Sequence, residues 1–326
     1  MTQTRLFLCT LLVAWLPIST VWAQATYPAK AVSLMVPYPA GGPSDAIARI
    51  FSTPISKDLQ TSVIVENLGG ASGSVAAQKV LSAPSDGHYI FQGSSNEVVL
   101  SPLVNASVKL KAEDFRLVHP IIDAVMVVLT RADLGVSTTD ELIALARKSP
   151  QPLTYGSVGI GSLYHFITED MQQRTSTKMS HIPYKGNAPV MADIGGGHLD
   201  FAVLVYSAGM GALAEQGKLK VIGQLGAIRS PLLPNVPAVS EGRELKNFSY
   251  RQWAGFMVPR STPEPVVERL HRSIQNVLRE ETVKTQLAAQ TMSPSAAMSL
   301  DEASRFFSTE TARYREMAKR INLQPQ

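Results

Sequence analysis

Cysteine is almost absent from this 326-residue chain, because the only one is Cys9, near the N-terminus. We expect residues 1–23 to be removed from the mature protein. A mature chain without cysteine can contain no disulfide, no thiolate metal site and no cysteine nucleophile. The sequence therefore predicts domains that are stable without covalent cross-links.

Long apolar runs are also scarce, and the one near the N-terminus is too short to cross a membrane. Arg5 precedes an apolar run over residues 6–16, Pro17 ends that run, and small residues follow up to Ala23. This order is typical of a secretory signal peptide, whereas a membrane-spanning helix needs about 20 apolar residues. We therefore expect export with cleavage after Ala23. Because Cys9 lies inside the apolar run and not at the cut, we expect no lipid anchor on it.

The charge balance is weak and the histidines are scattered. Lysine and arginine number 30 and the acidic residues 26, which gives a formal charge of +4, or +3 once Arg5 is lost with the signal peptide. This excess does not argue for nucleic acid or an anionic membrane as a partner. No two of the six histidines stand four residues apart, and we expect neither a metal site nor a cofactor.

The remaining composition is that of a globular protein with about two domains. Hydrophobic residues make up 45% of the chain and charged residues 17%, which is too apolar for disorder. Apolar runs alternate with helical patterns, and this alternation predicts α/β domains with mostly parallel sheets. The predicted strands cover residues 31–36, 63–65, 89–91, 126–129, 153–155 and 201–205. The predicted helices begin at Ser44 and after Ser162, and cover residues 139–148, 263–287 and 300–321.

A glycine loop joins the first predicted strand to the first predicted helix. Residues 37–45 read PYPAGGPSD, in which Ser44 fits the N-cap of the helix and Asp45 its first turn. Gly41 and Gly42 let the backbone come close to a ligand with its amides exposed. Such a helix start is an anion site that needs no lysine or arginine, although the same residues would also form an ordinary capped turn.

A second loop repeats this order in the other half of the chain. Residues 154–162 read TYGSVGIGS and lead into a helix that Ser162 would cap. Two helix starts, one from each half, would face each other across a cleft and suit a small dianion or a zwitterion. Three further loops would complete the cleft, although each alone is also typical of a surface turn. They cover residues 65–73, 93–96 and 183–186.

Seven segments, in this order along the chain, carry a resemblance to a known family. They read YPAKAVSLMVPYPAGGPSDAIAR, VIVENLGGASG, APSDGHYIF, LTYGSVGIGSLYH, HIPYKGNAPVMADIGGGHLDF, RSPLLPNVPAVSE and QWAGFMVPRSTP. Together they resemble the Bug-type extracytoplasmic solute receptors, the substrate-binding component of tripartite tricarboxylate transporters. The resemblance runs from about Tyr27 to the C-terminus.

The resemblance implies a type II periplasmic-binding fold, in which two α/β lobes with two crossing segments close over a central ligand cleft. It places residues 24–123 and 254–326 in lobe 1 and residues 124–253 in lobe 2. It further implies a periplasmic binding protein and not an enzyme, which works as a monomer without cofactor or metal. Its partners would be a small organic carboxylate and the membrane subunits of the transporter.

Ligand-binding roles carry over to the matching positions. The first glycine loop would contribute Tyr38, Ala40, Gly41, Gly42, Ser44 and Asp45. The second would contribute Ser157, Gly159, Ser162 and His165. From the three further loops we add Ala71, Ser94, Asn96, Tyr184 and Lys185 as ligand-binding candidates.

Three departures from the family pattern bear on the ligand. Pro43 stands where a small residue is more usual, and proline removes one amide donor from the loop. Leu68-Gly69 replaces an Arg-Pro pair, so a local charge is lost. Residues 203–205 are Val-Leu-Val where a polar pair is frequent. We therefore expect the far end of the ligand to be less polar than an ammonium group.

Other functions remain as alternatives. Residues 42–46 resemble a nucleophile elbow, so a secreted serine esterase would use Ser44 with Asp200 and His271; however, capping also explains Ser44, and His271 falls in a helical pattern. Residues 209–214 match G-x-G-x-x-A, but no acidic residue ends the next strand, which disfavours a dinucleotide site. A receptor feeding a membrane sensor kinase would use the same fold.

Overall fold

The computed structural model describes residues 27–321. The predicted signal peptide and its cleavage site lie outside the described residues. Among the described residues, none of the helices combines the length and the apolar character that crossing a membrane requires.

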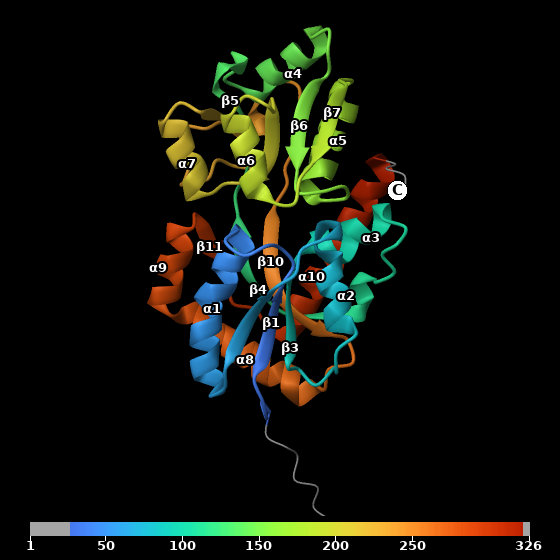
Figure 1. Cartoon of the computed structure of the whole chain (residues 1–326), viewed down its shortest axis with the longest axis vertical. Helices are drawn as coiled ribbons and strands as arrows, with labels where there is room; N and C mark the ends of the chain where they lie inside the picture. The colour runs from blue at the N-terminus through green and yellow to red at the C-terminus, as the bar shows by residue number, and fades with distance from the viewer. Residues whose placement is uncertain (1–26, 322–326) are drawn as a thin grey trace, which may run out of the picture.

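Two sheets form the frame of the molecule, one above the other along its long axis (Figure 1). The first has six strands in the order β11-β4-β10-β3-β1-β2, and the second has five in the order β7-β6-β8-β5-β9. The first sheet contains β1 (Val32–Val36), β2 (Val63–Asn67), β3 (Tyr89–Gly93), β4 (Phe115–Ala124), β10 (Gln252–Pro259) and β11 (Met292–Pro294). The second contains β5 (Met126–Arg131), β6 (Leu153–Ser157), β7 (Met179–Pro183), β8 (Phe201–Val205) and β9 (Leu219–Gln224). We call the part built on the first sheet the first lobe, and the other part the second lobe.

Helices cover both sheets, and the α/β prediction is confirmed. The first lobe carries α1 (Pro43–Leu59), α2 (Ser74–Leu81), α3 (Ser101–Val104), α8 (Glu264–Arg279), α9 (Glu281–Ala289) and α10 (Leu300–Ile321). The second carries α4 (Thr139–Lys148), α5 (Leu163–Thr175), α6 (Asn187–Gly195) and α7 (Ala208–Glu215). In Figure 1, α1 and α2 lie on opposite sides of the first sheet. The predicted helix over 263–287 is two helices, because the backbone of Glu280 is extended.

The prediction of mostly parallel sheets is wrong, since both sheets are mixed. β1 is parallel to β2 and β3, and β6 is parallel to β7 and β8. In contrast, β10 is antiparallel to β3 and β4, and β5 is antiparallel to β8 and β9. β5 and β10 are entered directly from the crossings between the lobes and not through an α-helix, so no strand–helix–strand connection sets their direction.

The first lobe's core follows from the helical spacing of apolar residues. Ile47, Phe51 and Ile55 recur every four residues on α1 and are buried. The Phe51 ring meets Phe256 of β10 edge-on, with centroids 5.5 Å apart. Each such side chain stabilises the fold by about 2 kcal/mol. This packing holds the start of α1 against the end of the sheet that faces the second lobe.

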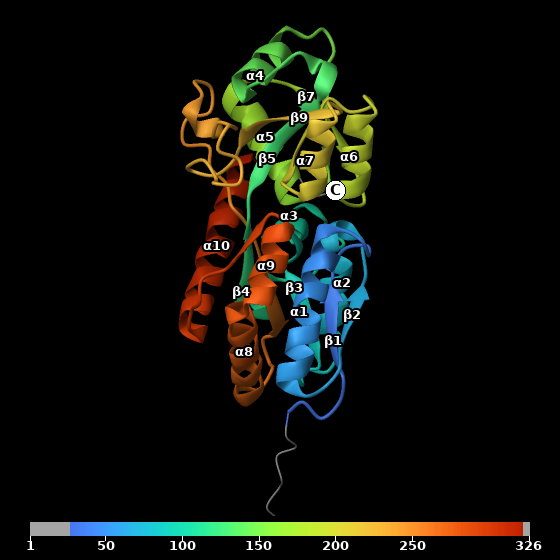
Figure 2. The same cartoon turned by 90° about the vertical axis from the view of Figure 1, so that its left-hand side faces the viewer.

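The chain crosses between the lobes twice, and α10 packs along the crossing. Val125 links β4 to β5, and the segment after β9 returns to β10. Trp253 donates its indole N–H to Glu310 of α10 at 3.1 Å. At its far end α10 reaches the second lobe, where Arg320 pairs with Asp170 of α5 at 3.3 Å. Figure 2 shows α10 running beside both lobes.

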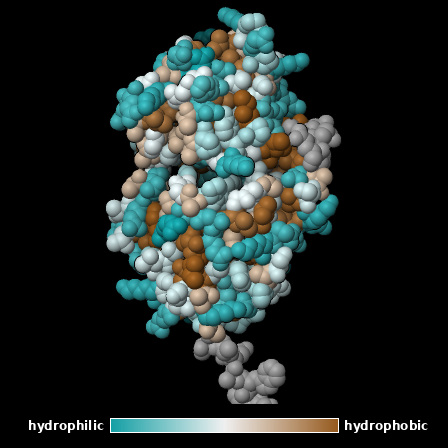
Figure 3. Space-filling model, in the orientation of Figure 1, coloured by the Kyte–Doolittle hydropathy of each residue, from teal (hydrophilic) through white to brown (hydrophobic). Residues whose placement is uncertain are grey.

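Hydrophilic and apolar residues are interspersed over the face of the molecule that Figure 3 shows.

Candidate functional site

A cavity of about 260 Å³ lies between the two lobes. The first lobe contributes residues 37–44, 92–94, 96 and 97, and the second contributes residues 185–189. Residues from strands, loops and helices complete the wall: Ile47, Ile122, Ala124, Val158, Tyr164, Val205, Gln252, Ala254 and Met292. The volume is close to the lower end of ligand pockets, roughly 300 Å³, and fits a small organic molecule.

The start of α1 forms one side of this cavity, with a different cap from the one predicted. Gly42 is the N-cap and Pro43 the first helical residue, so the prediction of Ser44 as N-cap is wrong. Proline suits this position because its fixed φ fits the helix and its missing N–H would have no partner within the helix. Ser44 lies in the first turn and lines the cavity.

Asp45 holds the glycine loop in place and does not line the cavity. The Gly41 amide donates to its carboxylate at 3.0 Å, and Arg49 donates to the same oxygen at 3.0 Å. Burial alone would raise the pKa of Asp45, but the hydrogen bonds from Arg49 and Gly41 outweigh it and hold the pKa below its usual value. Gly41 has a φ of +82°, a conformation that favours glycine.

The second helix start at the cavity belongs to α6, which the sequence reasoning missed. Its N-cap is Gly186, with a φ of +147°, and Lys185, Asn187, Ala188 and Pro189 line the cavity beside it. The signal was present in the segment KGNAP, where a glycine precedes a helical pattern. α1 and α6 therefore bring two helix N-termini, with their exposed amides and partial positive charge, to one cavity.

The sequence predicts the start of α5 as the second helix start that binds an anion. In the structure, backbone amides at this helix start already donate to acceptors within the protein. Ser162 is the N-cap, as predicted, and its hydroxyl accepts from the His165 amide at 3.3 Å. The Leu163 amide donates to the side-chain oxygen of Asn96, which belongs to the first lobe. A second contact of this kind joins the Ser72 hydroxyl to the Ile160 carbonyl at 2.8 Å. These bonds hold the two lobes together beside the cavity.

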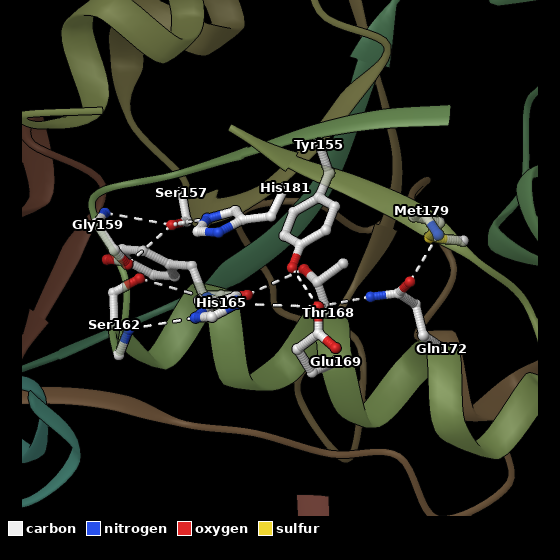
Figure 4. A network of polar contacts seen from close by, with 12 residues as sticks. Tyr155, Ser157, Gly159, Ser162, His165, Thr168, Glu169, Gln172, Met179 and His181 are labelled. Atoms are coloured by element: carbon white, nitrogen blue, oxygen red, sulfur yellow. Dashed lines mark hydrogen bonds and ion pairs between the residues drawn. The ribbon is translucent and has the colours of Figure 1, made fainter. Parts of the chain in front are cut away.

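A histidine pair packs beside the second glycine loop (Figure 4). His165 and His181 stack with ring centroids 4.0 Å apart. His181 shares a 2.7 Å hydrogen bond with Ser157, and His165 accepts from the Gly161 amide at 3.2 Å. Burial lowers the pKa of His165 to about 3 and that of His181 to about 4, so both rings are neutral at pH 7.

The predicted ligand-binding residues fall into three groups. Eight line the cavity: Tyr38, Ala40, Gly41, Gly42, Ser44, Ser94, Asn96 and Lys185. Ala71, Gly159 and Tyr184 line an adjoining cavity of about 530 Å³, which shares Tyr38, Pro39, Val158 and Lys185 with the first. Asp45, Ser157, Ser162 and His165 line neither of these two cavities and instead fix the loops around them.

Five polar residues at the cavity were missed, namely Gln92, Glu97, Tyr164, Asn187 and Gln252. Gln92 lies in the buried part of β3, and Glu97 lies in the π-helical turn η2 (Asn96–Leu100). Both line the cavity and both are 2% exposed. Of the apolar residues 203–205, only Val205 lines it. The wall is therefore partly polar.

The esterase geometry is not present. The Ser44 carbonyl accepts from Gln92 at 2.9 Å. Asp200 is held in the second lobe by Arg131 and Thr154, and the imidazole of His271 bonds to a backbone carbonyl of β4. The three residues have separate partners, so they form no triad.

The glycines of the G-x-G-x-x-A match lie inside α7 and form no phosphate loop. A Cβ at Gly211 would approach the Tyr206 hydroxyl to 2.8 Å, so close packing explains this glycine. Among residues 27–321, the histidine and carboxylate side chains form no cluster of three or more that could hold a metal ion.

Comparisons with known proteins identify the family. Residues 47–323 match the family described as tripartite tricarboxylate transporter family receptor. A UPF0065 protein from the TAR-I ttuE-ttuC′ intergenic region of Agrobacterium vitis is 32% identical, over 87% of this chain and 81% of its own length. The chain is therefore grouped with substrate-binding receptors and not with enzymes.

Solved structures agree with this assignment. R. palustris Rpa4515 with adipate superposes with a TM-score of 0.84 at 27% identity, covering 92% of this chain and all of its own. The periplasmic binding protein BugD superposes with a TM-score of 0.81 at 25% identity, with the same coverage. Both share the two-lobed fold that the resemblance implies. The chain belongs to the Bug-type solute receptors of the tripartite tricarboxylate transporter family.

Proposed function

We propose that this chain is exported to the periplasm, with cleavage after Ala23, and captures a small carboxylate-bearing molecule for the membrane subunits of a tripartite tricarboxylate-type transporter. The family and the fold support a soluble receptor that closes on a ligand. The lobes would comprise residues 24–123 with 254–326, and residues 124–253. Binding energy that favours the closed state would give the transporter a distinct surface to recognise.

The observation that carries the carboxylate assignment is the meeting of two helix starts at one cavity. The first turns of α1 and α6 come from opposite lobes. Lys185 is the only lysine or arginine among the residues that line this cavity. Backbone amides at both helix starts can replace the water that a carboxylate loses on entering. The solved relative Rpa4515, at 27% identity, holds adipate, which is consistent with a ligand of this class.

The direct test is a thermal-shift screen of residues 24–326 against small mono-, di- and tricarboxylates. A ligand that binds only the folded state raises the melting temperature as its concentration rises, by RT ln(1 + [L]/Kd) in free energy. We expect at least one acid to do so, and the corresponding amides and esters to have no effect. A screen in which no acid shifts the melting temperature would contradict the proposal.

A further inference from the structure

A buried carboxylate lies in the wall of a cavity that is proposed to bind an anion. Glu97 lines the cavity and is 2% exposed. Its carboxylate accepts from the Tyr38 hydroxyl at 2.6 Å, and from the backbone amide and hydroxyl of Ser94 at 2.6 and 2.9 Å. An ordinary pocket for a dicarboxylate has no reason to contain such a group, because a second anion would be repelled.

The hydrogen bonds around Glu97 fix it as an acceptor. The Asn96 amide donates to the Tyr38 oxygen at 3.3 Å, so the Tyr38 hydroxyl proton points to Glu97. The Asn96 backbone N–H donates to the Ser94 hydroxyl at 3.2 Å, which leaves that hydroxyl proton for Glu97 as well. Three donors on two oxygens suit an ionised carboxylate. A Cβ at Gly73 would clash with Glu97, so the side chain is also held tightly in place.

Glu97 has no cationic partner within the described residues. No lysine, arginine or histidine among residues 27–321 forms an ion pair with it. Burial raises the pKa of Glu97, and the hydrogen bonds from Tyr38 and Ser94 oppose that change. A buried carboxylate without a counter-ion is costly, and a cation arriving with the ligand would remove part of that cost.

Gln92 also lines the cavity, and its side chain carries an acceptor without a partner. Its amide nitrogen donates to the Ser44 carbonyl at 2.9 Å. A flipped amide would place two oxygens against each other, so this bond fixes which atom is the oxygen. That oxygen is buried and has no hydrogen-bond partner among the described residues. Buried polar atoms of this kind are rare in folded proteins, and a donor on the ligand would satisfy it.

We infer that the ligand carries an ammonium group as well as its carboxylate, and that Glu97, assisted by Gln92, is the specificity-determining residue that binds this group. The inference rests on the proposed function and narrows the proposed class of ligand from carboxylates to zwitterions. It replaces the expectation, drawn from residues 203–205, that the far end of the ligand is apolar. Lys185 and the helix starts bind the carboxylate, while the acceptors of the first lobe bind the ammonium.

The test uses four six-carbon acids that differ only in their second group: hexanoate, adipate, 2-aminohexanoate and 6-aminohexanoate. Calorimetric titration at pH 7.5 would measure each Kd for residues 24–326 of the wild type and of three variants. Glu97→Gln removes the charge and keeps the size. Gln92→Leu removes the second acceptor. Glu66→Gln is the matched control, because Glu66 lies on β2, does not line the cavity, and pairs with Lys79. Melting without ligand checks that each variant is folded.

We expect one of the two amino acids to bind wild type at least about ten-fold tighter than hexanoate and adipate. A hydrogen bond to a charged group supplies enough free energy for this difference in Kd. Glu97→Gln should abolish this preference, Gln92→Leu should reduce it, and Glu66→Gln should leave it unchanged. Equal or tighter binding of hexanoate or adipate to the wild type would overturn the inference. So would a preference that survives in Glu97→Gln. Binding of acids without this preference leaves the proposed function standing, whereas failure of every acid, in this series and in the wider screen, would contradict both.

Discussion

Single residues at the start of α1 determine how closely a ligand can approach the backbone. Gly41 has a φ of +82° and holds the turn, so a side chain there would strain the backbone. Gly42 has a φ of −84°, which any residue can adopt. A Cβ at Gly42 would lie 3.5 Å from the Pro39 carbonyl, an ordinary contact. Gly42 can therefore be substituted to fill the cavity without distorting the fold.

We predict that Gly42→Val abolishes the thermal shift produced by the acid that binds wild type. The two added methyl groups stand beside the first-turn amides and deny a carboxylate its donors. Without ligand, the variant should melt within a few degrees of wild type, since exchanging a capping glycine costs only about 1 kcal/mol.

The matched control for Gly42→Val is Gly209→Val. Gly209 is exposed on α7, and its Cβ would come no nearer than 3.9 Å to another side chain. This control should keep the full ligand response. A Gly42→Val protein that still responds to the acid as wild type does would count against the α1 start as the binding element.

At this scale, local chemistry could be predicted from sequence and long-range chemistry could not. The cap by Ser162 was predicted because it involves an amide only three residues away. The roles of Asn96 and Glu97 depend on partners 67 and 59 residues distant, which no local pattern reveals. Ser44 was misplaced because Pro43 begins the helix, two positions earlier than a serine N-cap implies.

Among the elements, the strands and helices with strong periodicity were predicted best. α4, α10 and β8 have the predicted bounds, because their apolar residues follow helical or buried-strand spacing without interruption. β4 and β10 were missed. Pro120 lies inside β4, and the ladder between the two strands shifts register near Gly255, which accommodates the proline. α6 was missed because its first turn, NAP, has the composition of a loop.

The stacked histidines beside the second glycine loop make stability depend on pH. Burial lowers the pKa of His165 to about 3 and of His181 to about 4, below the usual value of about 6.5 in an unfolded chain. Between these values the unfolded state binds more protons than the folded state. Stability from this pair is therefore complete above about pH 6.5 and declines as the pH falls towards about 4.

We predict that the urea midpoint of the ligand-free chain decreases between pH 6.5 and 4.5. In His165→Phe, the free energy of unfolding should fall less steeply with pH than in wild type. The two slopes should differ by roughly 1 kcal/mol per pH unit. Replacement of the exposed His198 by glutamine should leave the slope as it is in wild type. Parallel slopes for wild type and His165→Phe would show that the pair does not titrate in this way.

The whole molecule is arranged so that contacts other than the ligand already join the lobes. Asp170 of α5 is fully buried and pairs with Arg174 at 2.9 Å and with Arg320 of α10 at 3.3 Å. The Tyr250 hydroxyl, on the return crossing, also donates to Asp170. Two further bonds join the lobes, from the Leu163 amide to Asn96 and from the Ser72 hydroxyl to the Ile160 carbonyl. If the lobes separate, the bonds from Leu163 to Asn96 and from Ser72 to Ile160 must break.

The two-lobed organisation itself could be predicted from the order of the family segments. The pairing of helix starts could not, because it depends on how the lobes face each other. Sequence reasoning paired α1 with α5 on similarity of their loops, whereas the cavity brings α1 to α6. That difference follows from the bonds that Asn96 and Ser162 make to the first turn of α5.

The most direct test of the central claim is a crystal structure of residues 24–326 with the acid that gives the largest thermal shift. The account predicts that the ligand carboxylate lies between the lobes, within hydrogen-bond distance of first-turn amides of both α1 and α6. A carboxylate bound elsewhere, or held at the start of α5 with α6 turned away, would contradict it.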